Sequence, residues 1–223
     1  MKKVLIVVSH PDDEVLGCGG TIAKLVDKKC EVKVLFLSDG ESSRLRKENI
    51  KKNLYRRNCA IKAMKILGVK NFTFNNFPDN QFDTISLLKI SKRIEQEIQK
   101  YNPDTILTHH NGDLNIDHQR TSRAVLTACR PKVKNKVKLI LFFEILSSSE
   151  WNINSKKNFF IPNWYEDITK YLNKKIKAIK CYKKELRKAP HPRSLETIKA
   201  LSIFRGSSSG VKYAEAFQLG RKI

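Results

Sequence analysis

The chain has 223 residues, of which 40% are hydrophobic and 30% charged, a size and composition typical of one globular domain with a buried core. No apolar run approaches the roughly 20 residues of a membrane-spanning helix, which argues against an integral membrane protein. Lysine and arginine number 44 against 22 acidic residues, so the net charge is +22.

Such an excess of positive charge can indicate a nucleic acid, an anionic membrane surface or a phosphorylated substrate as partner. The basic residues are spread along the whole chain, and their densest group, within residues 170–188, alternates with apolar residues at helical spacing. This pattern predicts one amphipathic helix over residues 166–187 with a basic outer face. Because no basic and aromatic interleaving of a nucleic-acid module is present, no specific nucleic-acid partner is expected, and a nucleic-acid or membrane-surface binding module is the weaker alternative.

The five cysteines are odd in number, and no two are spaced as Cys-x-x-Cys. This usage predicts a reduced, cytoplasmic chain without a thiolate zinc site. The apolar stretch after Met1 is too short for a signal peptide and ends in charged residues.

Strand and helix patterns alternate along the chain. The expected strands are residues 4–8, 31–37, 71–74, 105–108 and 138–143, and the expected helices between them are residues 17–27, 50–67, 85–101 and 118–129. Asp83 is the expected N-cap of the third helix. This order predicts an α/β fold with a Rossmann-like parallel sheet flanked by helices.

The pattern changes after about residue 145. An irregular stretch with a hairpin is expected up to residue 162, followed by helices over residues 166–187 and 194–204 that are separated by Pro190-His191-Pro192. We therefore predict a single domain over residues 1–223, with a core of about 1–145 and an irregular, helical C-terminal cap of about 146–223. The sequence is compatible with a homo-oligomer.

Two polar clusters follow expected strands. The first is His10-Pro11-Asp12-Asp13-Glu14, and the second is the segment 109–118, which reads HHNGDLNIDH. Because the carboxyl ends of parallel strands share one edge of a sheet, both clusters are expected to converge there. Imidazoles and carboxylates are ligands that zinc prefers.

The two clusters together resemble the zinc-dependent N-deacetylases of the PIG-L or LmbE-like family. Asp39-Gly40-Glu41 and Leu67-Gly68-Val69 fall between them in the order expected for that family. The resemblance implies a hydrolase that removes an N-acetyl group from a small aminosugar or sugar conjugate, in a surface-polysaccharide or nucleotide-sugar pathway. A bacillithiol-type glycoside deacetylase is the alternative within the same family.

Carried over by position, the resemblance makes His10, Asp13 and His118 the ligands of one Zn²⁺ per chain, with other divalent metals possible. Two imidazoles and one carboxylate leave a coordination position open for water. Asp12 would be the general base. Glu14 would support the metal site or the start of the following helix.

One position departs from the family pattern. Many members carry a second histidine three residues before the ligand that matches His118, and this chain has Asn115 there. Asparagine can donate a hydrogen bond to an oxyanion but cannot act as an acid. The proton donor is therefore either Asp12, after it has taken a proton from water, or His191, for which a surface turn is the equal alternative.

Several further residues are candidates with plainer alternatives. Arg56 matches a family substrate arginine, although its neighbour Arg57 leaves the register open and a solvated helix face is the alternative. Trp151 and Trp164 could stack on a sugar or pack within the cap, and His110 could lie near the metal or be structural. The remaining candidates are Arg193 and Asp79 for substrate binding, and Asp113 and Asp117 for orienting a ligand.

Overall fold

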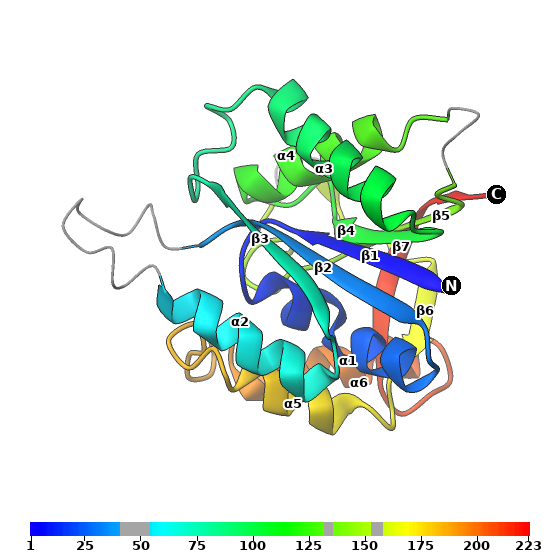
Figure 1. The fold of residues 1–223 in the computed structure, drawn as a ribbon. Helices are drawn as coiled ribbons and strands as arrows, with labels where there is room; N and C mark the ends of the chain where they lie inside the picture. The colour runs from blue at the N-terminus through cyan, green and yellow to red at the C-terminus, as the bar shows by residue number, and fades with distance from the viewer. Residues whose placement is uncertain (41–53, 132–135, 153–157) are drawn as a thin grey trace.

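The computed structural model describes residues 1–40, 54–131, 136–152 and 158–223. In these residues one mixed sheet has the strand order β3-β2-β1-β4-β5-β7-β6 (Figure 1). The strands are β1 (Lys3–Val8), β2 (Glu31–Ser38), β3 (Asn71–Phe77), β4 (Thr105–His109), β5 (Leu139–Phe143), β6 (Trp164–Asp167) and β7 (Ala214–Lys222). The first five pair in parallel, and β7 pairs antiparallel with both β5 and β6.

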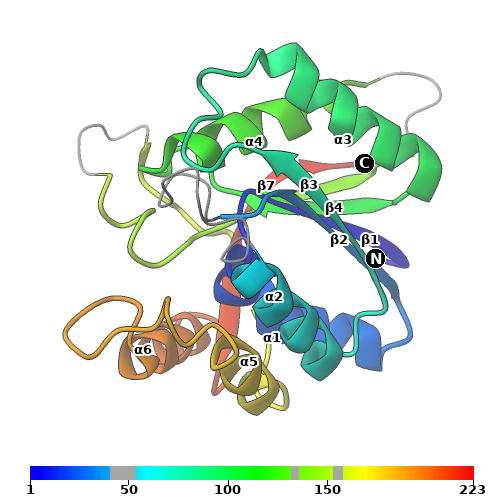
Figure 2. The same cartoon turned by 60° about the vertical axis from the view of Figure 1, so that its left-hand side comes forward.

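Helices cover both faces of the sheet (Figures 1 and 2). One face carries α3 (Leu87–Tyr101) and α4 (Ile116–Ala128), and the other carries α1 (Asp13–Asp27), α2 (Leu54–Leu67), α5 (Leu172–Ile179) and α6 (Leu195–Ser207). The predicted α/β fold with helices flanking a sheet is confirmed, and the sheet is parallel over β1 to β5 but mixed as a whole. No described helix is both long and apolar enough to cross a membrane.

Strand β1 explains why the core has two halves. Its side chains alternate, so Val4, Ile6 and Val8 pack into one apolar cluster and Leu5 and Val7 into the other. A strand buried on both faces needs a continuous apolar run, which is what made residues 4–8 readable in the sequence.

Elements up to residue 143 lie close to their predicted positions, with shifted starts. Helix α1 begins at Asp13 rather than residue 17, and α4 begins at Ile116. The N-cap of α3 is Ser86, whose hydroxyl accepts from the Lys89 N–H at 3.3 Å, and not Asp83. The part of the second predicted helix around residue 50 lies outside the described residues.

The C-terminal third differs most from the prediction. The long helix expected over residues 166–187 is wrong, because its first residues form β6 and its helical part is limited to α5. Lys175, which was expected on its basic outer face, is buried, and so is Glu185. Strand β7 was not predicted, and β6 pairs with it rather than with a strand in the described parts of 146–162, where a hairpin was expected. The division into core and cap stays a prediction.

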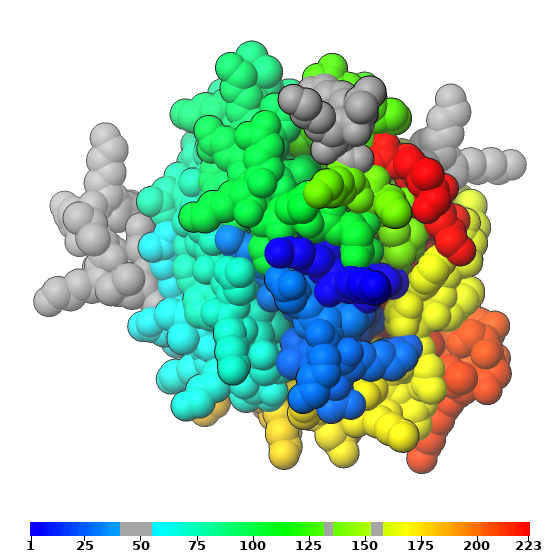
Figure 3. All heavy atoms as spheres, turned by 45° about the vertical axis from the view of Figure 1, so that its right-hand side comes forward, coloured from blue at the N-terminus to red at the C-terminus, as the bar shows by residue number. Residues whose placement is uncertain are grey.

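Both chain ends lie at the amino edge of the parallel strands, on the face shown in Figure 3. The N–H of Lys2 donates to Asp104 at 2.8 Å just before β4, and the N–H of Ile223 donates to the Lys138 carbonyl at 2.9 Å just before β5. The opposite, carboxyl edge is therefore free of the termini.

Candidate active site

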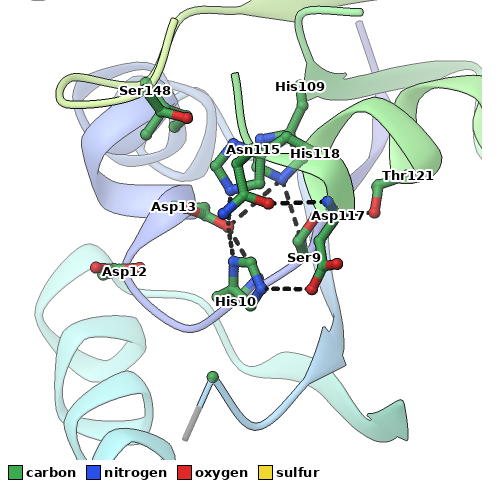
Figure 4. A network of polar contacts seen from close by, with 12 residues as sticks. Ser9, His10, Asp12, Asp13, His109, Asn115, Asp117, His118, Thr121 and Ser148 are labelled. Atoms are coloured by element: carbon green, nitrogen blue, oxygen red, sulfur yellow. Dashed lines mark hydrogen bonds and ion pairs between the residues drawn. The ribbon is translucent and has the colours of Figure 1, made fainter. Parts of the chain in front are cut away.

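The turn after β1 sends two adjacent carboxylates in different directions. Asp12 lies between β1 and α1 with φ 122° and ψ −29°, a backbone conformation rare outside glycine. In Figure 4 the side chain of Asp13 points toward His10 and His118, whereas that of Asp12 points away from them. His10, Asp12 and Asp13 are all buried.

His10, Asp13 and His118 converge at the carboxyl edge of the sheet. Oδ2 of Asp13 is 3.4 Å from Nδ1 of His10 and 3.4 Å from Nε2 of His118 (Figure 4). One ligand atom from each of the three residues lies within 4.8 Å of the others. The two clusters that the sequence placed at this edge are thus brought together across about a hundred residues.

The outer nitrogens of both histidines face carboxylates. Nε2 of His10 is 3.0 Å from Asp117 Oδ2 and 3.1 Å from Asp79 Oδ1, and Nδ1 of His118 is 3.1 Å from Asp113 Oδ1. A carboxylate partner keeps a hydrogen on that outer nitrogen, so each inner nitrogen can release its own proton and present a lone pair to a cation. Three acceptor atoms then face one another in a buried space, and this donor set fits a divalent cation such as zinc.

The charges around His118 and Asp13 also favour a positive charge between them. Burial alone lowers the pKa of His118, but attraction to Asp13 and Asp113 raises it to about 9. Burial alone raises the pKa of Asp113, but His118 and two serine hydroxyls bring it down to about 2. Burial alone also raises the pKa of Asp13, but the nearby histidines hold it well below its ordinary value. Asp13 and Asp113 therefore stay ionised at neutral pH and stabilise a cation beside them.

Asp12 is held by two arginines. Arg56 Nη2 lies 2.8 Å from Oδ1, and Arg193 Nη1 donates to Oδ2 at 3.0 Å. Burial raises the pKa of Asp12 above its ordinary value, and the two guanidinium groups oppose that rise. Behind them, the buried carboxylate of Glu185 lies 3.8 Å from Arg56 Nε and 3.4 Å from Arg193 Nη1.

Glu14 supports the turn rather than the cavity. Its carboxylate accepts from the N–H of Asp12 at 2.9 Å and from the Tyr182 hydroxyl at 2.5 Å. Burial raises the pKa of Glu14 to about 8, although both hydrogen bonds lower it. Tyr182 thereby connects the C-terminal segment to the backbone that carries Asp12.

A small polar cavity of about 70 Å³ lies beside these groups. Its described lining residues are His10, Asp12, Arg56, Asp79, Asn80, Asn115, His118, Ser147, Ser148 and Arg193. Asn115 is the N-cap of α4, because its side-chain oxygen accepts from the Asp117 N–H at 2.8 Å. Its amide nitrogen donates to Asn80 at 3.1 Å.

Most sequence candidates lie at this site, but not all. Arg56 is buried beside Asp12 and does not lie on a solvated helix face. His191 is absent from the described cavity lining; its ring lies edge-on to Trp151 at 5.9 Å, and its Nδ1 accepts from the Arg193 N–H. Nε2 of His110 is 2.9 Å from the Asn158 carbonyl oxygen. Trp164 donates to Glu166 within β6.

The sequence reading missed His109 and Glu185. The His109 ring stacks on that of His118, with centroids 3.9 Å apart, and its Nε2 accepts from the Ser9 N–H at 2.9 Å. Burial holds the pKa of His109 well below its ordinary value, so it is neutral. The position of His109 at the end of β4 could have predicted that it lies at the site. Glu185 lies beyond the end of α5, and no sequence pattern predicts its position there.

The sequence profile of the PIG-L family, described as GlcNAc-PI de-N-acetylase, matches residues 5–129. This stretch runs from β1 to the end of α4 and contains the converging histidines and Asp13. The chain belongs to this family.

Deacetylases are among the curated proteins that are similar to this chain. Diacetylchitobiose deacetylase of Thermococcus kodakarensis is 25% identical over 236 residues, which cover 98% of this chain and 83% of that protein. The probable N-acetyl-alpha-D-glucosaminyl L-malate deacetylase 2 of Bacillus cereus is 25% identical over 194 residues, covering 82% and 84% of the two chains.

Solved structures share the fold. N,N'-diacetylchitobiose deacetylase from Pyrococcus horikoshii has a TM-score of 0.78 at 24% identity and covers 99% of this chain and 84% of its own. The 4-carboxy-2-hydroxymuconate hydratase GalB from Pseudomonas putida has the same TM-score and identity, covering 100% and 98%. Since one fold carries both reactions, the residues of the site decide the chemistry.

Proposed function

We propose that this PIG-L protein is a metal-dependent deacetylase that hydrolyses the N-acetyl group of a small aminosugar or sugar conjugate. The observation that supports this most is the convergence of His10, Asp13 and His118 beside a separate carboxylate, Asp12. A hydratase on the same fold would not explain why the relatives by sequence are deacetylases.

His10, Asp13 and His118 would hold one Zn²⁺ per chain, and other divalent metals would fit the same donors. When bound, zinc lowers the pKa of water and polarises an amide carbonyl. Asp113 and Asp117 would keep the two imidazoles in the ligating tautomer, with Asp79 adding a second acceptor to His10.

Asp12 would be the general base. Its carboxylate lines the cavity, takes a proton from the attacking water and passes it to the departing amine nitrogen. Arg56 and Arg193 fix the position of that carboxylate through its two oxygens. Asn115 lines the same cavity and has donor capacity for the substrate.

His191 stays an alternative proton donor. Its ring is held against Trp151 near Arg193, so reaching the cavity would require a rearrangement of its loop. Turnover of the His191→Ala variant at the wild-type rate would remove it from the mechanism.

An aminosugar is the proposed substrate because both curated relatives are named for N-acetylated sugar compounds. The relative named for a glucosaminyl malate keeps a bacillithiol-type glycoside as the second candidate. The five free cysteines favour a reducing, cytoplasmic location. A homo-oligomer and a surface-polysaccharide or nucleotide-sugar pathway remain part of the proposal.

The test is acetate release from a panel of N-acetylated sugars, including a glucosaminyl malate, with and without chelator. We expect release from at least one sugar, loss of release on chelation, and its return with added zinc. Release that is unaffected by chelation would contradict the proposal.

A further inference from the structure

The cavity beside Asp12 is too small for a whole sugar substrate. Its volume is about 70 Å³, whereas pockets that enclose small ligands begin at roughly 300 Å³. Every described residue that lines it is polar. It can take the N-acetyl group, and the remainder of the substrate must contact the surface around the opening.

An exposed tryptophan lies in a loop that borders this cavity. The side chain of Trp151 is 47% exposed, and its backbone N–H donates to the carbonyl of Ser148 at 3.3 Å. Ser147 and Ser148, in the same loop, both line the cavity. Trp151 therefore follows directly on the part of this loop that lines the cavity.

The indole of Trp151 is held in place by a second loop. It lies edge-on to the ring of His191, with centroids 5.9 Å apart and an angle of 80°. His191 is fixed in turn, since its Nδ1 accepts from the Arg193 N–H at 3.0 Å. Arg193 donates from Nε to Ser147 at 2.6 Å, so the two loops are joined both at the cavity and outside it.

We infer that Trp151, with His191 against it, is the binding platform for a second sugar ring, joined to the aminosugar whose acetyl group enters the cavity. The apolar C–H face of a sugar suits a large, rigid aromatic surface, and its hydroxyls remain in water. This inference rests on the proposed deacetylation and narrows its substrate class to disaccharides and larger glycosides.

The chain has two tryptophans, and Trp164, which lies away from the cavity, provides a matched control for Trp151. Its indole N–H donates to Glu166 at 2.9 Å, and Lys222 lies over its ring at 5.7 Å. These contacts keep Trp164 within the β6–β7 pair, and it is not among the described residues that line the cavity.

The first test reads binding without turnover. In an Asp12→Asn background, Trp164→Phe leaves Trp151 as the only tryptophan, and Trp151→Phe leaves Trp164. Saturation with N,N'-diacetylchitobiose should shift the emission of Trp151 to shorter wavelength and leave that of Trp164 unchanged. An unresponsive Trp151, or an equal response of both tryptophans, overturns the platform.

The second test uses rates. In Trp151→Ala, the ratio of kcat/KM for diacetylchitobiose to kcat/KM for N-acetylglucosamine should fall about three- to tenfold, and Trp151→Phe should restore most of it. An unchanged ratio overturns the platform. Failure of the proposed deacetylation is a different result, namely a normal Trp151 emission shift in the Trp164→Phe variant together with no acetate release by the wild type.

Discussion

At the scale of single residues, Asp12 is the position where the chain departs most from easy backbone geometry. A non-glycine residue at φ 122° costs about 1–3 kcal/mol and persists only when its surroundings hold it. Glu14 accepts the Asp12 N–H, and Arg56 and Arg193 hold its carboxylate. This turn sends the side chains of the two neighbouring aspartates in different directions, as their proposed roles of metal ligand and general base require.

Glu185 is expected to act on Asp12 through the two arginines. In Glu185→Gln, Arg56 and Arg193 lose a charged partner, so they position the Asp12 carboxylate less precisely. We therefore expect kcat to fall about tenfold with little change in KM. Acetate-release kinetics test this. The exposed Glu196 on α6 gives the control variant, Glu196→Gln, and equal kinetics for both variants would contradict the role of Glu185.

Single site residues could be predicted where they are close together in the sequence. His10, Asp12 and Asp13 follow a strand directly, so their place at the carboxyl edge could be read from the sequence. Glu185 and the stacking of His109 on His118 could not, because both depend on how distant segments pack. The roles of all these residues stay predictions.

At the scale of elements, α1 shows how the C-terminal segment completes the core. The helix is broken at Cys18, and a break leaves backbone groups without helical partners. Glu215 on β7 accepts from the N–H groups of Gly20 and Thr21 at 2.9 and 2.7 Å. Lys175 on α5 donates to the Leu16 carbonyl at 2.9 Å and pairs with Glu215 at 2.6 Å.

Removing one partner of this buried pair should be costly. Lys175→Met leaves Glu215 buried without its counter-charge, so the free energy of unfolding should fall by about 3–5 kcal/mol. Urea denaturation measures it. The neighbouring Lys174 is exposed, and Lys174→Met should change stability by less than about 0.5 kcal/mol. Equal effects of the two variants would contradict this account.

A second element-level contact makes stability depend on pH. Burial alone raises the pKa of Glu97 on α3, but its bonds with Lys33 on β2 and Arg93 lower the pKa below 4.5. A carboxyl with a depressed folded pKa stabilises the fold above its unfolded pKa and loses this effect as the pH falls through the folded value. As the pH is lowered from 4.5, the free energy of unfolding of Glu97→Gln should therefore decrease less than that of the wild type.

The same elements show why the C-terminal third escaped prediction. β1 is an unbroken apolar run and is therefore recognisable in the sequence. In contrast, β7 contains a buried glutamate and pairs with β5, some 70 residues earlier in the chain. The apolar residues of segment 166–187 have helical spacing, but Lys175 points inward and pairs with Glu215. Tyr182 donates to Glu14, and Glu185 faces the two arginines. Tertiary contacts there override the local pattern.

At the scale of the whole molecule, metal binding should be linked to folding, since the proposed ligands come from the turn after β1, from α1 and from α4, and converge only in the native state. Zinc at 100 times its dissociation constant adds about 2.7 kcal/mol of stability. For a chain of this size, the unfolding temperature should rise by roughly 5–11 °C. Thermal unfolding of chelated and zinc-loaded protein tests this, and coincident curves would contradict it.

The central claim is that three ligands hold a metal while Asp12, beside them, does chemistry without holding it. The most direct measurement is zinc content and acetate release for wild type, Asp12→Asn and His118→Ala side by side. We predict that Asp12→Asn keeps one zinc per chain while its kcat falls about 10²–10⁴-fold, and that His118→Ala loses both metal and activity. Full activity in Asp12→Asn, or retained zinc in an active His118→Ala, would contradict the account.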